Sequence, residues 1–223
     1  MIGDLLPHAL VLIVAIGAYS LSSRQLDHAI KAFAIQSYAL AFVAIVGAQH
    51  PQGHTTDLWL LAVLTVTVKG VIVPIALFGA VGRLRIRHEI EFIVNVPSTL
   101  LVAGVGTLGA FAVAERIFGG TAAELRGALG AGLATVLLGL LVMLGRRQVI
   151  SQIIGLLIME NGVILCALGL TLGMPLIVEI GVALDVLVAV QILALFAYRI
   201  GSGLDAPVPG PPETPETPEE RSA

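Results

Sequence analysis

The chain has 223 residues, of which 57% are hydrophobic and only 12% charged, and its mean hydropathy is +0.98. This composition excludes a soluble globular domain and is typical of an integral membrane protein. The formal net charge of −3 comes from an acidic tail, and the rest of the chain is mildly basic without a patch that would bind nucleic acid.

Seven apolar stretches follow one another along the chain. A helix needs about 20 apolar residues to cross a hydrocarbon core of about 30 Å. The stretches that qualify occupy residues 5–21, 29–48, 58–80, 92–114, 123–144, 150–171 and 175–199. Short connections that carry the charged residues separate them. The sequence therefore predicts an all-α, polytopic membrane protein, with one domain of seven transmembrane helices over residues 1–200.

The positions of the arginines predict the orientation of this domain. Arginines gather in alternate connections and at the end of the last stretch, whereas the opposite side has only Arg116 and Arg126. The first group consists of Arg24, Arg83, Arg85, Arg87, Arg146, Arg147 and Arg199. Because basic residues accumulate on the cytoplasmic side, we expect the N-terminus outside and the C-terminus in the cytoplasm. Residues 201–223 are rich in Pro and Glu, which predicts a disordered cytoplasmic tail.

Titratable side chains inside the apolar stretches are the strongest indication of function. Glu160, Glu179 and Asp185 lie in the last two stretches, and Lys69 lies in the third. An ionised carboxylate at the bilayer centre costs roughly 2.5 to 3.5 kcal/mol on insertion scales, so these groups require an explanation. At a rise of about 1.5 Å per residue, three of them lie roughly 15 to 17 Å deep, and Glu179 lies nearer the outer face. The sequence predicts a proton or ion path.

Two interpretations of these charges remain open. In the first they form a relay. In the second Lys69 makes a static ion pair with Glu160 or Asp185, which would hold helices together without moving protons. For Glu160 the neighbouring residues favour a relay, because Asn161 adjoins it and nearby glycines leave room for water or a close helix.

Other small and polar residues receive structural interpretations. The glycines of the fourth, fifth and sixth stretches favour close helix packing; they are Gly104 and Gly106, Gly127 to Gly132, and Gly155 to Gly162. Pro74 predicts a kink five residues past Lys69 and frees a carbonyl to accept a hydrogen bond. Cys166 is expected to be a small core residue, and the five scattered histidines do not predict a metal site. With no nucleophile–base pair and no cofactor fingerprint, independent catalysis is not expected of this chain.

The run IIGLLIMENGVILCALGL, followed by PLIVEIGVALDVLVAVQIL, resembles the hydrogenase-4 component E family. This family supplies a membrane subunit to group 4 nickel–iron hydrogenase complexes of the formate hydrogenlyase type. The last three stretches are in turn similar to the K subunit of respiratory complex I. In that subunit a glutamate directly follows a Gly-Leu pair, whereas here Leu157 has that position and Glu160 comes one helical turn later. The displaced carboxylate stays on nearly the same helix face.

The resemblance implies a subunit of a bacterial or archaeal plasma membrane that holds no cofactor itself. Nickel–iron and iron–sulfur centres would lie in partner subunits. This chain would relay protons between antiporter-like subunits and the membrane anchor through Glu160, Asp185 and Lys69, with Glu179 as the neighbour on the outer side. Two alternatives remain: a subunit of a multisubunit cation/proton antiporter, and a non-conducting membrane scaffold.

Overall fold

The computed structural model describes residues 5–49, 55–83, 95–119 and 123–171, and the regular elements in these ranges are all helices. In chain order they are α1 (Leu6–Ser22), α2 (Leu26–Ala48), α3 (Thr55–Leu64), η2 (Thr65–Ile72), α4 (Val73–Arg83), α5 (Val96–Phe118), α6 (Ala123–Leu144) and α7 (Val149–Thr171). The predicted stretch at 175–199, with Glu179 and Asp185, and the tail at 201–223 lie outside the described residues.

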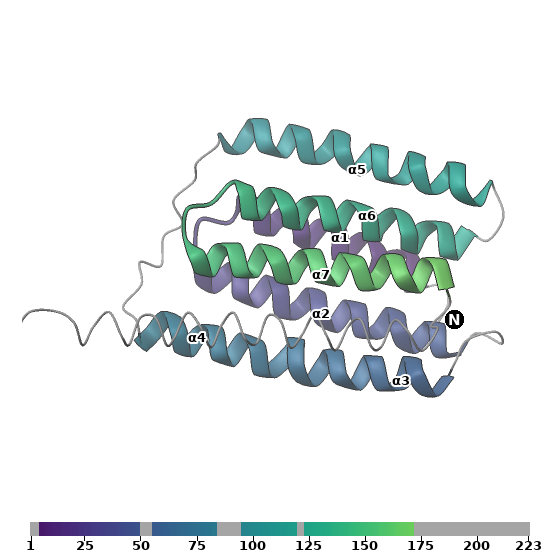
Figure 1. Ribbon diagram of the computed structural model, residues 1–223, viewed down its shortest axis with the longest axis horizontal. Helices are drawn as coiled ribbons and strands as arrows, with labels where there is room; N and C mark the ends of the chain where they lie inside the picture. The colour runs from purple at the N-terminus through teal and green to yellow at the C-terminus, as the bar shows by residue number, and fades with distance from the viewer. Residues whose placement is uncertain (1–4, 50–54, 84–94, 120–122, 172–223) are drawn as a thin grey trace, which may run out of the picture.

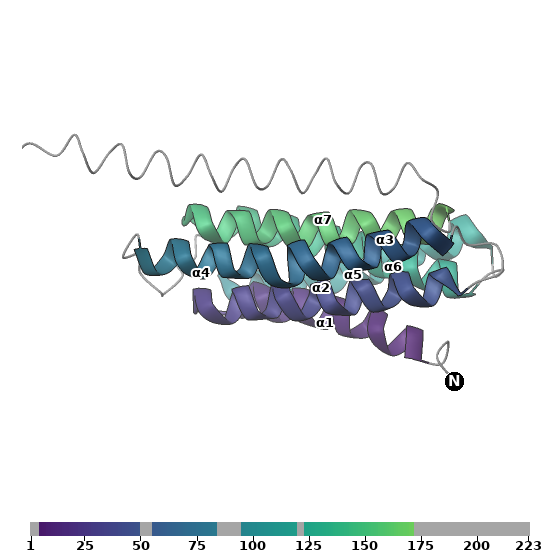
Figure 2. The ribbon, with the colours of Figure 1, turned by 90° about the horizontal axis from the view of Figure 1, so that it is seen from below.

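The helices form an elongated bundle in which neighbours run side by side (Figure 1). Helix α5 lies along one edge, and α3 and α4 lie along the opposite edge. Between them, α6 packs against α5, α1 and α7, while α2 packs against α1, α7 and the α3–η2 segment. Figure 2 shows α1 and α7 on opposite sides of the bundle.

Five helices are long and apolar enough to cross a membrane, judged by length and composition alone. They span Leu26–Ala48, Thr56–Gly82, Val96–Phe118, Ala123–Leu144 and Val149–Leu170. Helix α1 has 17 residues and lies at the short end of the range for a membrane span. The chain is thus an all-helical, multi-pass membrane protein in its described part, and the count of seven spans stays a prediction.

The start and end of α5 differ from the predicted stretch for local reasons. The helix begins at Val96, after Asn95 as its N-cap, with Pro97 in its first turn. A proline is tolerated there because its missing N–H would have no partner within the helix. The helix ends at Phe118 because Gly119 adopts the left-handed conformation, with φ of 55°. The prediction of 92–114 therefore ends four residues too early, and its first three residues lie outside the part of the chain that the structure describes.

The third stretch is one continuous helix whose middle is a π-helix. Residues Thr65–Ile72 form this segment, and α3 and α4 extend it without a break. Pro74, the second residue after this segment, lacks the N–H that would donate to the Gly70 carbonyl in an α-helix. The hydroxyl of Tyr38, from α2, donates to that carbonyl at 3.0 Å. A side chain therefore satisfies the carbonyl that the proline leaves free.

Helices α6 and α7 contact each other through glycines. Gly132 and Gly139 of α6 face Gly155 and Gly162 of α7, and the two glycines of each helix are seven positions apart in the sequence. A Cβ atom at Gly132 would lie 2.9 Å from the Gly162 carbonyl oxygen, and one at Gly155 would lie 2.9 Å from the Gly139 carbonyl oxygen. These backbone contacts confirm the predicted packing role of these four glycines, which form what we call the glycine seam. The prediction is wrong for Gly104 of α5, because a Cβ atom there would have nothing within 4 Å.

Candidate functional site

The structure brings together two of the four predicted path residues. Lys69 from η2 and Glu160 from α7 form an ion pair in which Nζ and Oε1 are 3.0 Å apart. The side chains are 0% and 2% exposed, so the pair lies inside the bundle. The sequence analysis allows Glu160 or Asp185 as the partner of Lys69, and only Glu160 lies within the described residues. The roles of Glu179 and Asp185 stay predictions.

Asn161 connects this pair to helix α2. Lys69 Nζ donates a hydrogen bond to Asn161 Oδ1 at 3.3 Å. Because an ammonium group only donates, the amide oxygen must face Lys69 and the amide nitrogen must face away from it. That nitrogen lies 3.4 Å from both Gln36 Oε1 and Ser37 Oγ. Gln36, Ser37, Lys69, Glu160 and Asn161 are all buried, and we call them the polar cluster.

The hydrogen bonds continue from α2 to the backbone. Gln36 Nε2 donates to the Ile13 carbonyl of α1 at 3.0 Å, and Ser37 Oγ donates to the Phe33 carbonyl of its own helix at 3.0 Å. Successive donors thus point from Lys69 through Asn161 and Gln36 to α1. The network fixes both amide orientations and joins α1, α2, η2 and α7.

Apolar side chains enclose the polar cluster at both ends. Toward the end where α1 begins lies a buried apolar group that includes Ile13, Leu40 and Leu165. Toward the other end lies a second group that includes Phe33 and Leu157. The cluster is therefore a polar layer in the middle of a dry bundle. Electrostatic interactions there are stronger than at a protein surface, because the surroundings screen charge poorly.

The π-helix helps to place Lys69. The buried residues of this segment are Thr65, Lys69 and Gly70, while Val71 and Ile72 are exposed. A Cβ atom at Gly70 would lie 2.8 Å from the Tyr38 ring, so the glycine lets Tyr38 reach across to η2. Short π segments often occur at functional sites. Nothing in the apolar pattern of the third stretch reveals this one.

Gln36, Ser37 and Asn161 are not among the predicted path residues, although all three belong to the polar cluster. The available signal is that each is polar within an otherwise apolar stretch. Among the residues that the structure describes, no three His, Cys, Asp or Glu side chains gather closely enough to hold a metal ion.

Arg146 is a second buried cation. In the sequence it serves only to predict the orientation of the protein in the membrane. It lies between α6 and α7, is 1% exposed, and donates to the carbonyls of Ser20 and Ser23 at the end of α1. Burial lowers the pKa of Arg146 to about 10, so the guanidinium stays charged at neutral pH. A cation at these carbonyls also complements the negative end of the α1 dipole. Arg147, the next residue, is exposed.

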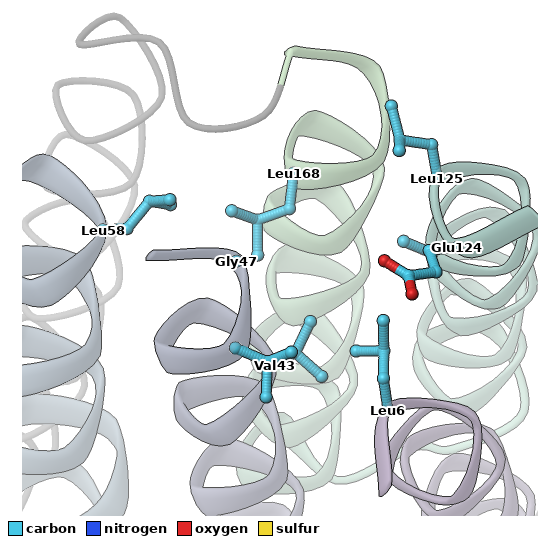
Figure 3. A pocket seen from close by; sticks show the side chains of 9 residues that line it. Leu6, Val43, Gly47, Leu58, Glu124, Leu125 and Leu168 are labelled. Atoms are coloured by element: carbon cyan, nitrogen blue, oxygen red, sulfur yellow. The ribbon is translucent and has the colours of Figure 1, made fainter. Parts of the chain in front are cut away.

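An apolar recess opens at the opposite end of the bundle (Figure 3). It encloses about 500 Å³, including the open space at its mouth, and Glu124 is the one charged side chain among the described residues that line it. These residues are Leu6, Val43, Val46, Gly47, Leu58, Glu124, Leu125, Ala128 and Leu168. Leu168 is two helical turns beyond Glu160, about 12 Å along α7. The apolar group around Leu40 separates the recess from the polar cluster.

Known proteins share sequence with this chain. The protein Rv0085 of Mycobacterium tuberculosis, described as uncharacterized, is 32% identical over 178 residues, which are 79% of this chain and 80% of the relative. Hydrogenase-4 component E of Escherichia coli is 39% identical over 101 residues, or 45% of this chain and 46% of that protein, and the Shigella flexneri protein of the same name matches equally. The chain thus aligns with about half the length of the hydrogenase component. No family model and no solved structure matches the chain.

Proposed function

Because this chain belongs to the family of the Mycobacterium tuberculosis protein Rv0085 and is similar over part of its length to hydrogenase-4 component E, we propose that it is a membrane subunit of a hydrogenase-type complex. Electron transfer takes place in partner subunits that carry nickel–iron and iron–sulfur centres. This chain, resembling the K subunit of complex I in its last part, relays protons between antiporter-like subunits and the membrane anchor.

One observation supports the proposed relay above all: a lysine and a glutamate on different helices lie 3.0 Å apart at the centre of an apolar bundle. A proton that passes from the Lys69 ammonium to the Glu160 carboxylate changes a charged pair into a neutral pair. The net charge of the pair is zero in both forms, so transfer leaves no uncompensated charge in the dry interior. A step of this kind suits a group that receives a proton from one neighbour and delivers it to another.

Asn161 keeps the donor in place during this step. Its amide oxygen accepts from Lys69 at 3.3 Å whether the lysine is charged or neutral, because an amine still has N–H groups to donate. In this proposal Asp185 and Glu179 extend the path, Asp185 at similar depth and Glu179 toward the outer side.

The proposal is tested by measuring proton movement that is coupled to electron transfer in membrane vesicles containing the native complex. Glu160→Gln, alone and together with Asp185→Asn, should abolish coupled proton movement while the complex still assembles. Glu124→Gln is the matched control, since Glu124 lies at the apolar recess and outside the polar cluster. Unchanged pumping in both Glu160 variants would remove Glu160 from the path.

A non-conducting scaffold is the second candidate, and the same ion pair favours it. A buried pair that only joins η2 to α7 would also explain the contacts of Lys69. In that case any variant that keeps the helices together should pump normally, including a double variant in which both charges are removed. The relay requires that the double variant assembles and does not pump.

A further inference from the structure

The ammonium group of Lys69 lies among the kinds of oxygen atoms that bind alkali cations. A carboxylate oxygen of Glu160 is 3.0 Å away and the amide oxygen of Asn161 is 3.3 Å away. Behind Asn161 are two further oxygens, Gln36 Oε1 and Ser37 Oγ, each 3.4 Å from the amide nitrogen. Carboxylate, amide and hydroxyl oxygens are ligands that hard cations such as sodium prefer.

We infer that Lys69 fills a latent sodium site with its own ammonium group, and that the polar cluster therefore works with protons and excludes sodium. The inference rests on the proposed relay function and adds its ion specificity. The lysine is attached to η2, so its head group is always at high effective concentration beside Glu160. A proton can leave the amine while the amine stays in place. A sodium ion can enter only if the whole side chain moves away.

Removal of the ammonium should expose the latent site. With methionine at position 69, Glu160 loses the ammonium group 3.0 Å from it, and the loss of a neighbouring cation is unfavourable for a buried carboxylate unless it binds a proton or another cation. The amide oxygen of Asn161, which accepts from Lys69 in the natural protein, remains because it does not belong to the substituted residue. Sodium then has a negative ligand and a neutral oxygen ligand at the place of the ammonium group.

The test follows the reaction of Glu160 with dicyclohexylcarbodiimide, a reagent for carboxyl groups inside membranes. Membranes with the full complex are treated in sodium chloride or in choline chloride of equal concentration, and modified Glu160 is quantified by peptide mass spectrometry. In the natural protein the two salts should give the same rate. In Lys69→Met sodium should slow the reaction, by about tenfold when sodium is ten times its dissociation constant.

Two further variants control this result. Lys31→Met removes an exposed lysine at the start of α2 and should behave like the natural protein. Lys69→Met combined with Asn161→Leu removes an oxygen ligand and should lose the protection. If Lys69→Met does not assemble, Lys69→Gln is measured in its place.

Sodium protection in the natural protein would overturn the inference, and so would equal rates in the two salts for the assembled Lys69 variant. Neither result depends on transport. Failure of the proposed function is seen separately, as unchanged proton movement in Glu160→Gln.

Discussion

Lys69 and Glu160 persist inside an apolar bundle because each neutralises the other and Asn161 supplies a further acceptor. Each charge alone would be unfavourable in a dry interior. The exposed pair between Arg126 and Glu115, at 2.8 Å, is different because water solvates both of its members. The two ion pairs therefore contribute differently to stability although their N–O distances are similar.

Stability measurements should expose this difference. Lys69→Met and Glu160→Gln should each lower the free energy of unfolding by about 3 to 5 kcal/mol, because each leaves one buried charge without its partner. The double variant should be more stable than either single variant. Arg126→Gln, the control at the exposed pair, should cost about 0 to 1 kcal/mol. Thermal unfolding in detergent or nanodiscs measures all four, and additive losses at Lys69 and Glu160 would contradict the coupling.

The sequence alone predicts much of the candidate site at the level of single residues. Lys69 and Glu160 are identifiable because a charge within an apolar stretch is rare and costly. An ion pair of Lys69 with Glu160 or Asp185 is among the predictions, but the choice between these carboxylates is not predictable in the same way, since it depends on how the helices face each other across the bundle. Arg146 and Arg147 are adjacent and chemically identical, and only packing makes the first buried and the second exposed.

Among the elements, the glycine seam and the π-helix set the positions of the two helices that carry the ion pair. The seam places α7 close against α6, so the face of α7 with Glu160 is directed by backbone contact. The π-helix rotates the third helix locally around Lys69. The length of each apolar stretch predicts that a helix is present, and proline and glycine predict where some helices begin or end. Neither signal predicts a change from α-helix to π-helix within a continuous apolar stretch.

Gly139→Ala should destabilise the protein, because the new methyl group would meet the backbone of Met159 and lie 2.7 Å from the Gly155 carbonyl oxygen. Overpacking against backbone typically costs about 1 to 3 kcal/mol. Gly104→Ala on α5 is the matched control, since a Cβ atom there has nothing within 4 Å and alanine favours helix. The melting temperatures of the two variants should separate clearly, and equal values would argue against close contact at the seam.

Pro74→Ala should disturb the relay more than the fold. The restored N–H can donate to the Gly70 carbonyl, as in an ordinary α-helix, and it competes there with Tyr38. A return to α-helix would turn Lys69 away from Glu160. We expect proton movement to fall about tenfold or more, since a misplacement of about 1 Å can cost about 10²-fold. Pro97→Ala, in the first turn of α5, should pump normally. Normal pumping in Pro74→Ala would show that the π segment is not needed.

At the scale of the whole molecule, burial differs strongly between the helices. In α5 only Ala103, Ala110 and Ala114 are buried, and Leu101 and Leu108 are 68% and 74% exposed. Large apolar side chains also lie outward on the α3–α4 edge, among them Trp59 and Ile75. In a membrane these faces meet lipid or the helices of other subunits, so both long edges of the bundle are suited to apolar surroundings.

The predicted orientation is tested with single cysteines in a Cys166→Ala background. Glu124→Cys lies at the end where α6 begins, and Arg147→Cys lies at the end where α7 begins, and both positions are exposed. If the N-terminus is outside, a membrane-impermeant maleimide should label position 124 in intact cells and position 147 only after permeabilisation. The reverse pattern would contradict the orientation that the arginines predict.

The ion pair also has a consequence for how the protein is made. Asn161, next to Glu160, comes 92 residues after Lys69 in the chain. At roughly 5 to 20 residues per second, the ribosome needs roughly 5 to 20 s to add them. During that interval Lys69 has been synthesised and its counter-ion has not. The ion pair that joins η2 to α7 can therefore form only after α7 has been made.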